Sequence, residues 1–232
     1  MFELGDKVAV VTGAGSGIGW AIARLFAQQG AAVAALDRDE AAASAIAATI
    51  RDAGGTASFH RCDVGDEADV AESFRRIEVA QGRVDILVNN AGIAHIGSIE
   101  TTSPDEFDRL FRVNVRGVYL CSRAAIPIML GRGGGVVLNM ASIASLVGLP
   151  DRFAYSMTKG AVLTMTRSIA VDYVKRGIRC NCICPARVHT PFVDGYLAAN
   201  YPGREAALYL CSDEAGFVTG QAYTIDGGAL AR

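Results

Sequence analysis

Tyr155 and Lys159 are the two residues of this sequence best placed to move a proton. They are four positions apart, and apolar residues in the segment 160–175 recur at spacings of three, four and seven, which predicts a helix. Side chains at i and i+4 lie on one helix face, so the phenol and the ammonium group should be neighbours. A free tyrosine has a pKa of about 10, and a nearby positive charge lowers it. The pair could therefore exchange a proton with a substrate hydroxyl or carbonyl.

Ser142 follows an apolar strand predicted at residues 136–139, and its hydroxyl could hold the same substrate oxygen. On its own, the spacing of Tyr155 and Lys159 is equally typical of a half-buried tyrosine beside a lysine that extends to solvent. The interpretation of this pair therefore depends on the elements that would position it.

A glycine-rich turn follows the first predicted strand, residues 7–12, which is short, apolar and β-branched. The turn contains Gly13, Gly15, Gly17 and Gly19. The apolar stripe after it predicts a helix that ends at Gly30. In such a strand–turn–helix unit, glycines let the backbone approach a pyrophosphate whose charge lies on the helix N-terminus. The strand and the helix on either side favour a dinucleotide-binding turn over a chance run of glycines.

Asp37 ends the second predicted strand, residues 31–36, and lies 18 positions after Gly19. At this point of a βαβ unit an acid can accept hydrogen bonds from both ribose hydroxyls of a dinucleotide. The alternative is a helix N-cap, but Asp39 is better placed for that role. Arg38 could hold a 2′-phosphate, which Asp37 would repel. The sequence therefore predicts NAD rather than NADP.

Strands alternate with helices along the rest of the chain, and no linker divides it. Further strands are predicted at residues 56–62, 84–88, 136–139, 178–184 and 222–225, and helices at 41–53, 67–80, 107–130 and 206–212. This pattern predicts one domain, residues 1–232, with an α/β fold: a doubly wound, Rossmann-like, seven-stranded parallel sheet with helices on both faces. Asn90 and Gly92 follow the fourth strand and should line a groove at the carboxyl ends of the strands.

Asn114 and Gly117 are poor residues for the middle of the helix predicted at 107–130. They indicate either a simple break or a kink that frees a backbone carbonyl for a bound water.

Taken together, the motifs resemble those of the short-chain dehydrogenase/reductase family over residues 7–228. The matching motifs are residues 12–19, Asn89-Asn90-Ala91-Gly92, Asn114, Ser142 and residues 155–159. The resemblance implies a catalytic tetrad of Asn114, Ser142, Tyr155 and Lys159. It implies cofactor contacts at Gly13, Ser16, Ile18, Gly19, Asp37, Asp63, Val64, Asn90, Gly92, Tyr155, Lys159, Val188 and Thr190. Lys159 would bind the nicotinamide ribose and also tune Tyr155. A homotetramer is implied as well.

Residues 179–185 and Arg152 narrow the resemblance. They are similar to the cytosolic type 2 3-hydroxybutyrate dehydrogenases, and to bacterial dehydrogenases that oxidise 2-keto-3-deoxy sugar acids such as 2-keto-3-deoxy-L-fuconate. Both groups handle carboxylate substrates. The Arg152 guanidinium could bind such a carboxylate with paired donors, or it could be a surface arginine paired with Asp151.

We therefore expect an NAD-dependent enzyme that oxidises a secondary alcohol of a small hydroxy acid, with Ser142, Arg152 and Tyr155 contacting the substrate. The alternatives are a 3-hydroxybutyrate-type dehydrogenase, an NADP-dependent carbonyl reductase, and a non-catalytic dinucleotide-sensing protein. The presence of Ser142, Tyr155 and Lys159 together argues against a sensor.

The chain departs from the family pattern at two places. Pro185 is followed by Ala186 where the family has glycine. The substrate lid expected near residues 191–205 is short by about twenty residues by analogy with this fold. Either the lid is truncated or the sequence lacks part of it, and the second is favoured because lids of this kind are mobile.

Composition excludes several other classes of protein. The net charge is −2, from 22 basic and 24 acidic residues, without the basic patch that nucleic-acid binding needs. No apolar run approaches the ~18 residues of a membrane span, and the N-terminus lacks a signal-peptide pattern, so a cytoplasmic location is expected. The six cysteines do not suggest a disulfide framework. Cys180, Cys182 and Cys184 alternate on a predicted strand, and buried packing is favoured over a metal site.

Overall fold

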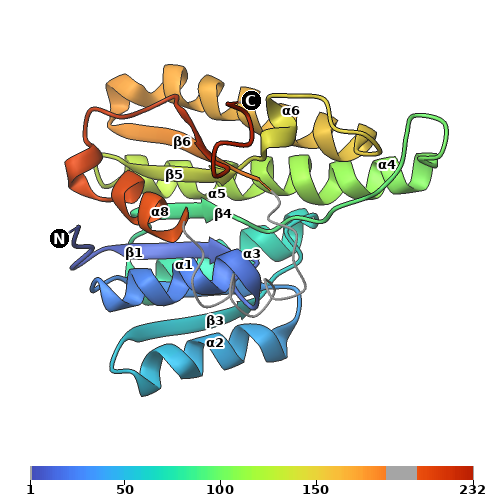
Figure 1. The fold of residues 1–232 in the computed structure, drawn as a ribbon. Coiled ribbons are helices and arrows are strands. Elements are labelled where there is room, and N and C mark those ends of the chain that lie inside the picture. Colours follow the sequence, from blue (N-terminus) through green and yellow to red (C-terminus); the bar gives the residue numbers. More distant parts are fainter. Residues whose placement is uncertain (1, 187–202, 232) are drawn as a thin grey trace.

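The sheet is the centre of the molecule. In this computed structural model, which describes residues 2–186 and 203–231, seven parallel strands are hydrogen-bonded in the order β3-β2-β1-β4-β5-β6-β7 (Figure 1). The strands are β1 (Val8–Thr12), β2 (Ala32–Asp37), β3 (Thr56–Arg61), β4 (Ile86–Asn89), β5 (Gly135–Met140), β6 (Ile178–Pro185) and β7 (Ala222–Ile225). The strand order reverses beside β1, between β2 and β4. In an open parallel sheet, ligands bind outside the carboxyl ends of the strands at such a reversal.

Helices cover both faces of the sheet, which confirms the predicted doubly wound architecture. Helices α1 (Gly17–Gln28), α2 (Glu40–Asp52) and α8 (Gly203–Cys211) pack on one face. Helices α3 (Glu67–Gln81), α5 (Gly117–Leu130) and α6 (Phe153–Tyr173) pack on the other, and α4 (Pro104–Phe111) extends from α5 beyond the sheet (Figure 1). Short helical turns lie at Ile143–Ser145 (η2), Val174–Arg176 (η3) and Asp213–Ala215 (η4).

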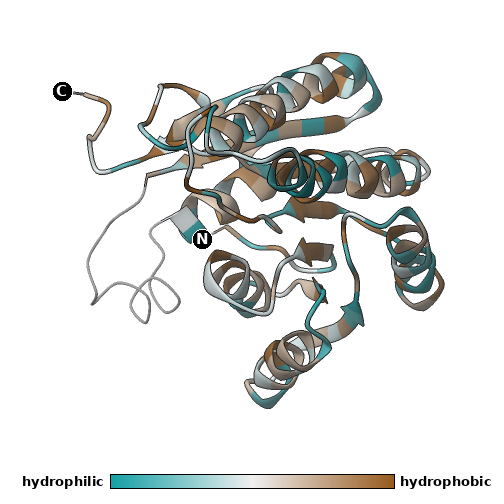
Figure 2. Cartoon of the chain, turned by 90° about the vertical axis from the view of Figure 1, so that its right-hand side faces the viewer, coloured by the Kyte–Doolittle hydropathy of each residue, from teal (hydrophilic) through white to brown (hydrophobic). Residues whose placement is uncertain are grey.

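Burial on both faces explains the composition of the central strands. Every residue of β1 and of β4 is buried, so these strands are continuous apolar runs without alternation. In Figure 2 the strands are largely brown, while hydrophilic residues lie on the outer sides of the helices. All six cysteines are buried as thiols, and those of β6 pack beneath α6. Within the described residues, no group of three or more His, Cys, Asp or Glu side chains could hold a metal ion.

Local sequence explains where several helices begin. Asp39 caps α2, as predicted, because its carboxylate accepts hydrogen bonds from the backbone N–H groups of Ala41 and Ala42. Ser103 caps α4 in the same way, and Pro104 occupies the first helical position. Within residues 2–186 and 203–231, no helix is both long and apolar enough to cross a membrane.

The helix predicted at residues 107–130 is divided into three parts. Between α4 and α5 lies a π helix, η1 (Arg112–Arg116), which is called the π turn below. Asn114 is at its centre and Gly117 begins α5, so the two poor helix formers mark the irregularity. Wider turns of this kind occur mostly as single interruptions of α-helices, frequently at functional sites.

Helix α8 begins at Gly203, three residues before the helix predicted at 206–212, so the C-terminal end of the region expected near the lid is helical. The remainder of the predicted lid, residues 191–202, lies outside the described residues, as do Val188 and Thr190.

Candidate active site

The glycine turn after β1 has the backbone geometry expected of a phosphate-binding turn. Gly13 and Gly17 have φ values of +63° and +53°, a region that favours glycine. A Cβ at Gly19 would lie 2.2 Å from the Gly13 carbonyl oxygen, so α1 can approach the turn closely only without a side chain there. The turn leads into the N-terminus of α1, whose unpaired N–H groups suit an anion.

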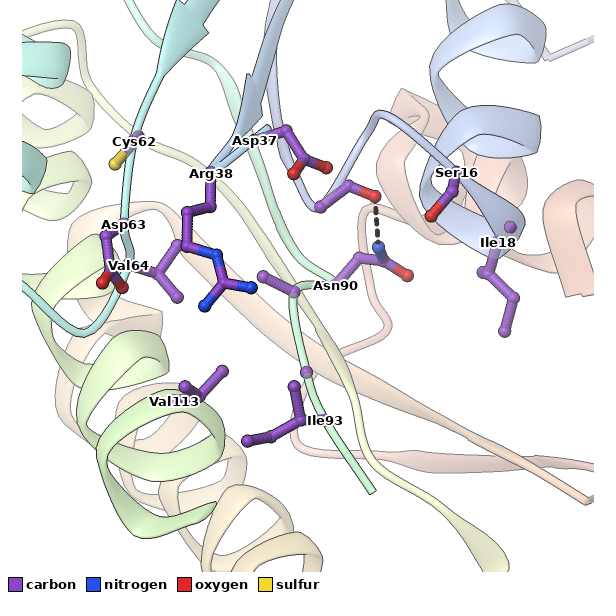
Figure 3. A pocket seen from close by; sticks show the side chains of 14 residues that line it. Ser16, Ile18, Asp37, Arg38, Cys62, Asp63, Val64, Asn90, Ile93 and Val113 are labelled. Carbon is purple, nitrogen blue, oxygen red and sulfur yellow. Dashed lines mark hydrogen bonds between the residues drawn. The ribbon is translucent and has the colours of Figure 1, made fainter. Parts of the chain in front are cut away.

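Asn90 ties this turn to β4. Its side-chain amide donates hydrogen bonds to the carbonyl oxygens of Thr12 and Gly13 at 3.0 and 3.1 Å. Figure 3 shows the bond to Gly13 as a dashed line. The Thr12 hydroxyl in turn accepts from the backbone N–H groups of Asn90 and Ala91, both at 3.0 Å. Asn90 therefore fixes the shape of the glycine turn, in addition to lining the space in front of it.

A groove of about 400 Å³ opens at the carboxyl ends of β1, β2, β3 and β4 (Figure 3). Its size is in the range of small-molecule sites. Eight of the predicted cofactor residues line it: Gly13, Ser16, Ile18, Asp37, Asp63, Val64, Asn90 and Gly92. Gly19 lies behind the turn, against Gly13 and Asn90. The motifs did not identify Cys62, Ile93 and Val113, which also line the groove. The sequence signals them only by position, because each lies next to a predicted site residue.

Asp37 and Arg38 lie side by side at the end of β2, and both line the groove. The Asp37 carboxylate accepts hydrogen bonds from the backbone N–H groups of Gly15 and Asp39, each at 3.0 Å. These bonds hold the carboxylate against the glycine turn. The Arg38 side chain extends into the groove (Figure 3).

Lys159 lies on α6 with its side chain inside the protein. Its ammonium group donates a hydrogen bond of 2.6 Å to the Met140 carbonyl oxygen at the end of β5. The nitrogen is 5.9 Å from the centre of the Tyr155 ring, one turn away, as the four-residue spacing predicts. Burial lowers the pKa of Lys159 to about 8, because the charged form loses hydration there.

The expectation that Lys159 lowers the pKa of Tyr155 is wrong for this structure. Burial raises the pKa of Tyr155, and this effect outweighs the hydrogen bond with Ser142 and the charge of Arg152, both of which lower it. Desolvation disfavours the phenolate and the ammonium group alike, so close spacing on a helix does not by itself produce a low tyrosine pKa.

Asn114 connects the π turn to two neighbouring segments. Its side-chain oxygen accepts from the Ile93 N–H at 2.8 Å, and its amide donates to the Ile93 carbonyl oxygen at 2.8 Å. The amide also donates to the Thr158 hydroxyl at 3.1 Å, and Thr158 donates to the Tyr155 carbonyl oxygen at 2.8 Å. Asn114 thus orients the segment after β4 and the start of α6.

Ser142 follows β5 and begins the short turn η2. Its hydroxyl accepts from the Ala144 N–H at 3.2 Å, and its own N–H donates to the Ser145 hydroxyl at 3.3 Å. This reciprocal capping fixes the Ser142 side chain, whose interaction with the Tyr155 phenol acts to lower the pKa of that phenol.

Gly92 links the groove to the catalytic residues. A Cβ at this position would lie 3.3 Å from the Asn114 side-chain oxygen and 3.5 Å from the Lys159 nitrogen. The end of β4 therefore passes directly against two of the four predicted catalytic residues. A dinucleotide extended from the glycine turn along this strand end would reach Lys159 and Tyr155, so the residues present fit such a cofactor.

Arg152 is placed by a short backbone bridge at the start of α6. The Gly97 N–H donates to the Asp151 carbonyl oxygen at 2.9 Å, and the Phe153 N–H donates to the Gly97 carbonyl oxygen at 3.1 Å. The Arg152 guanidinium donates to the His95 carbonyl oxygen at 3.1 Å. In the described part of the chain, Arg152 therefore bonds to a backbone oxygen instead of forming the alternative pair with Asp151. The charge of Arg152 acts to lower the pKa of Tyr155, although burial of the phenol outweighs it.

Comparison with known proteins agrees with this fold. The family model described as short chain dehydrogenase matches residues 7–200. The chain is 40% identical over 247 aligned positions to an uncharacterized oxidoreductase of Thermotoga maritima, covering 97% of this chain and 98% of that protein. It is 41% identical over 248 positions to 2-(R)-hydroxypropyl-CoM dehydrogenase of Xanthobacter autotrophicus, covering 97% and 99%. Both alignments are longer than this chain of 232 residues, so the relatives contain positions that it lacks.

The crystal structure of a protein described as a short-chain dehydrogenase/reductase, from Burkholderia xenovorans, superposes with a TM-score of 0.92 at 35% identity. The match covers 100% of this chain and 99% of that one. The fold and the site together define an oxidoreductase of the nicotinamide dinucleotide-dependent class. The chain belongs to the short-chain dehydrogenase family.

Proposed function

We propose that this protein is an NAD-dependent dehydrogenase that oxidises the secondary alcohol of a small hydroxy acid. The observation that carries the proposal is the convergence of Ser142, Tyr155 and Lys159 beside the end of the groove that the glycine turn and Asp37 line. A non-catalytic sensor would need the groove but would have no use for the three side chains.

In the proposed reaction Tyr155 is the acid–base. Its phenolate takes the proton of the substrate hydroxyl while a hydride leaves the carbon that bears this hydroxyl, and Ser142 donates a hydrogen bond to the hydroxyl oxygen. A bound oxidised nicotinamide supplies the hydride acceptor and a positive charge. That charge acts against the effect of burial, which raises the pKa of Tyr155 in the protein alone.

Lys159 and Asn114 have supporting roles in this proposal. Lys159 is held by the Met140 carbonyl oxygen and lies close enough to Gly92 to bind the nicotinamide ribose. The Asn114 side chain is occupied by Ile93 and Thr158, so a water of the proton relay would bind to a backbone carbonyl of the π turn. The proton taken by Tyr155 would then reach solvent through that water.

NAD is proposed as the cofactor because of Asp37. Its carboxylate is held at the mouth of the glycine turn, where it would accept hydrogen bonds from the ribose hydroxyls and repel a 2′-phosphate. Arg38 supports a second candidate, an NADP-dependent carbonyl reductase, because its side chain extends into the same groove. The ratio of kcat/KM for the two cofactors decides between them.

The acid substrate is proposed from Arg152. Its guanidinium, whose charge acts to lower the pKa of Tyr155, has five N–H donors and can pair with a carboxylate in a planar geometry. A 2-keto-3-deoxy sugar acid such as 2-keto-3-deoxy-L-fuconate is the proposed substrate, with 3-hydroxybutyrate as the alternative. The name of the Xanthobacter relative, 2-(R)-hydroxypropyl-CoM dehydrogenase, also describes oxidation of a secondary alcohol. A cytoplasmic homotetramer completes the proposal.

A substrate screen tests the proposal. Purified protein is assayed with NAD and with NADP against these sugar acids, 3-hydroxybutyrate, both enantiomers of 2-hydroxypropyl-CoM, and uncharged secondary alcohols such as 2-butanol. Formation of reduced nicotinamide is followed by absorbance. The acids should be oxidised faster than the uncharged alcohols, and NAD should be the better cofactor. Binding of NADH without turnover of any alcohol would favour the sensor.

A further inference from the structure

The π turn lies between the groove and the catalytic helix, and it contacts both. Val113 lines the groove, and the next residue, Asn114, bonds to the segment after β4 and to α6. Arg112 and Arg116, at the two ends of the turn, extend toward the loop that follows β3. The π turn therefore contacts the groove, the loop after β3, the segment after β4 and α6.

Arg112 makes the side-chain contact with the groove. Its guanidinium donates a hydrogen bond of 2.7 Å to the Asp63 carboxylate, whose other oxygen accepts from the Gly65 N–H at 2.9 Å. The side chain of Arg112 lies flat over Gly65, where an added Cβ would be 2.8 Å from the Arg112 Cγ. The Asp63 side chain is about one fifth exposed and the Arg112 side chain about one half, and the 2.7 Å bond joins residues 49 positions apart.

The backbone of the loop after β3 is also fitted to the π turn. Arg116 donates to the Gly65 carbonyl oxygen at 2.9 Å. Gly117, just past the turn, packs on Val64 so closely that an added Cβ would be 2.8 Å from its side chain. Asp63 and Val64 line the part of the groove next to Arg38 (Figure 3). Any shift of this loop must therefore be accompanied by a shift of the π turn.

We infer that Arg112 is a positioning residue for both ends of the site: it fixes Asp63 in the cofactor groove and, through the π turn, it fixes Asn114 against Ile93. This inference rests on the proposed function only in treating the groove as the cofactor site. The Asp63–Arg112 pair then stabilises the arrangement of Asn114 even when no cofactor is bound. Removal of the guanidinium loosens Asn114 at a distance from the substrate.

Hydrogen exchange of the Ile93 amide, followed by NMR without added nucleotide, tests this directly. This amide donates to the Asn114 side chain, so its exchange rate reports how firmly Asn114 is held. In Arg112→Gln the amide should exchange about three to ten times faster than in the intact protein. Arg112→Lys should restore part of the protection. The matched control is Arg123→Gln, which removes an exposed arginine of α5 paired with Glu67 and should leave the rate unchanged.

A second variant distinguishes loss of the Asp63–Arg112 pair from a general loss of stability. Asp63→Asn should accelerate the same amide, and adding Arg112→Gln to it should produce little further change, because both substitutions break one interaction. An unchanged Ile93 rate in Arg112→Gln, or additive effects of the two substitutions, would overturn the inference. This measurement needs no cofactor, so its result is independent of whether the protein oxidises alcohols.

Turnover gives the second readout. Nicotinamide mononucleotide lacks the adenine half, so Arg112 can affect its reaction only through the π turn. With the best substrate of the screen, Arg112→Gln should lower kcat with NAD, and should lower turnover with nicotinamide mononucleotide by a similar factor of about three to ten. A loss confined to NAD would mean that Arg112 serves the adenine end alone. Failure of the intact enzyme with both NAD and NADP would instead refute the proposed function.

Discussion

Lys159 is the buried group whose removal should have the most distinctive effect on stability. Its ammonium group lies inside the protein, and burial lowers its pKa from 10.5 to about 8. Lys159→Met keeps most of the volume of the side chain and removes the charge. We expect this variant to lose activity, because it lacks the ammonium group proposed to bind the nicotinamide ribose, yet to remain folded.

The size of the stability effect follows from the change in pKa. At 1.36 kcal/mol per pH unit, lowering the pKa from 10.5 to about 8 corresponds to about 3 kcal/mol of destabilisation by the charged form. Between about pH 8 and 10.5 the unfolded chain keeps a proton that the folded chain has lost. The free energy of unfolding of the intact protein should therefore rise with pH through this window. Below pH 8 the full penalty is present, and Lys159→Met avoids it.

The substitution also leaves the Met140 carbonyl oxygen without its donor, at a cost of about 1–3 kcal/mol. Because that cost is the same at every pH, a change with pH in the stability difference between the two proteins reports the charge of Lys159 alone. Between pH 7 and pH 10.5 the free energy of unfolding of the intact protein should rise by about 3 kcal/mol relative to that of Lys159→Met. The exposed residue Lys175 provides a matched control, and Lys175→Met should follow the intact protein at every pH.

Urea unfolding at four or five pH values measures these differences, with the fluorescence of Trp20 as the signal. If the free energies of unfolding of the intact protein and of Lys159→Met changed in parallel over the whole pH range, the reasoning would be refuted. They would show that the buried amine holds its proton as firmly as an exposed one.

Three further predictions concern activity. Tyr155→Phe removes the ionisable proton and should lower kcat by about 10² or more while NADH binding, measured by fluorescence, is retained; near-normal turnover would exclude Tyr155 as the acid–base. Asp37→Ala should narrow the preference for NAD over NADP in kcat/KM, and an intact enzyme that is faster with NADP would show that Arg38 dominates. Arg152→Met should lower kcat/KM for acid substrates about tenfold to a hundredfold and spare uncharged alcohols. Equal losses for both would remove the physical support for an acid substrate.

Local sequence was sufficient for the elements and for much of the site. The sequence predicted all seven strands to within a few residues. The five central strands, β2, β1, β4, β5 and β6, are largely apolar because they are buried on both faces. The four-residue spacing of Tyr155 and Lys159, and the glycines before α1, placed both halves of the site because each depends on contacts within one helix or turn.

Properties that depend on tertiary surroundings could not be read in the same way. The upward shift of the Tyr155 pKa comes from burial beneath neighbouring segments, which helical spacing does not report. The pairing of Asp63 with Arg112 joins residues 49 positions apart through a π turn. A poor helix former such as Asn114 predicts that the helix is irregular there, but it does not reveal which side chains the irregularity aligns.

The backbone bridge between Gly97 and Arg152 has a consequence for how specificity could change in this protein. It joins the segment after β4 to the first turn of α6 outside the sheet, by two hydrogen bonds between main-chain atoms. Because these bonds do not depend on the identity of the side chains, residues around the bridge can be exchanged while the bridge itself is kept. His95, Ile96 and Phe153 are therefore natural positions for a library that seeks new substrates. Such a library would alter the surface around Arg152 and leave the backbone that carries Tyr155 and Lys159 in its present arrangement.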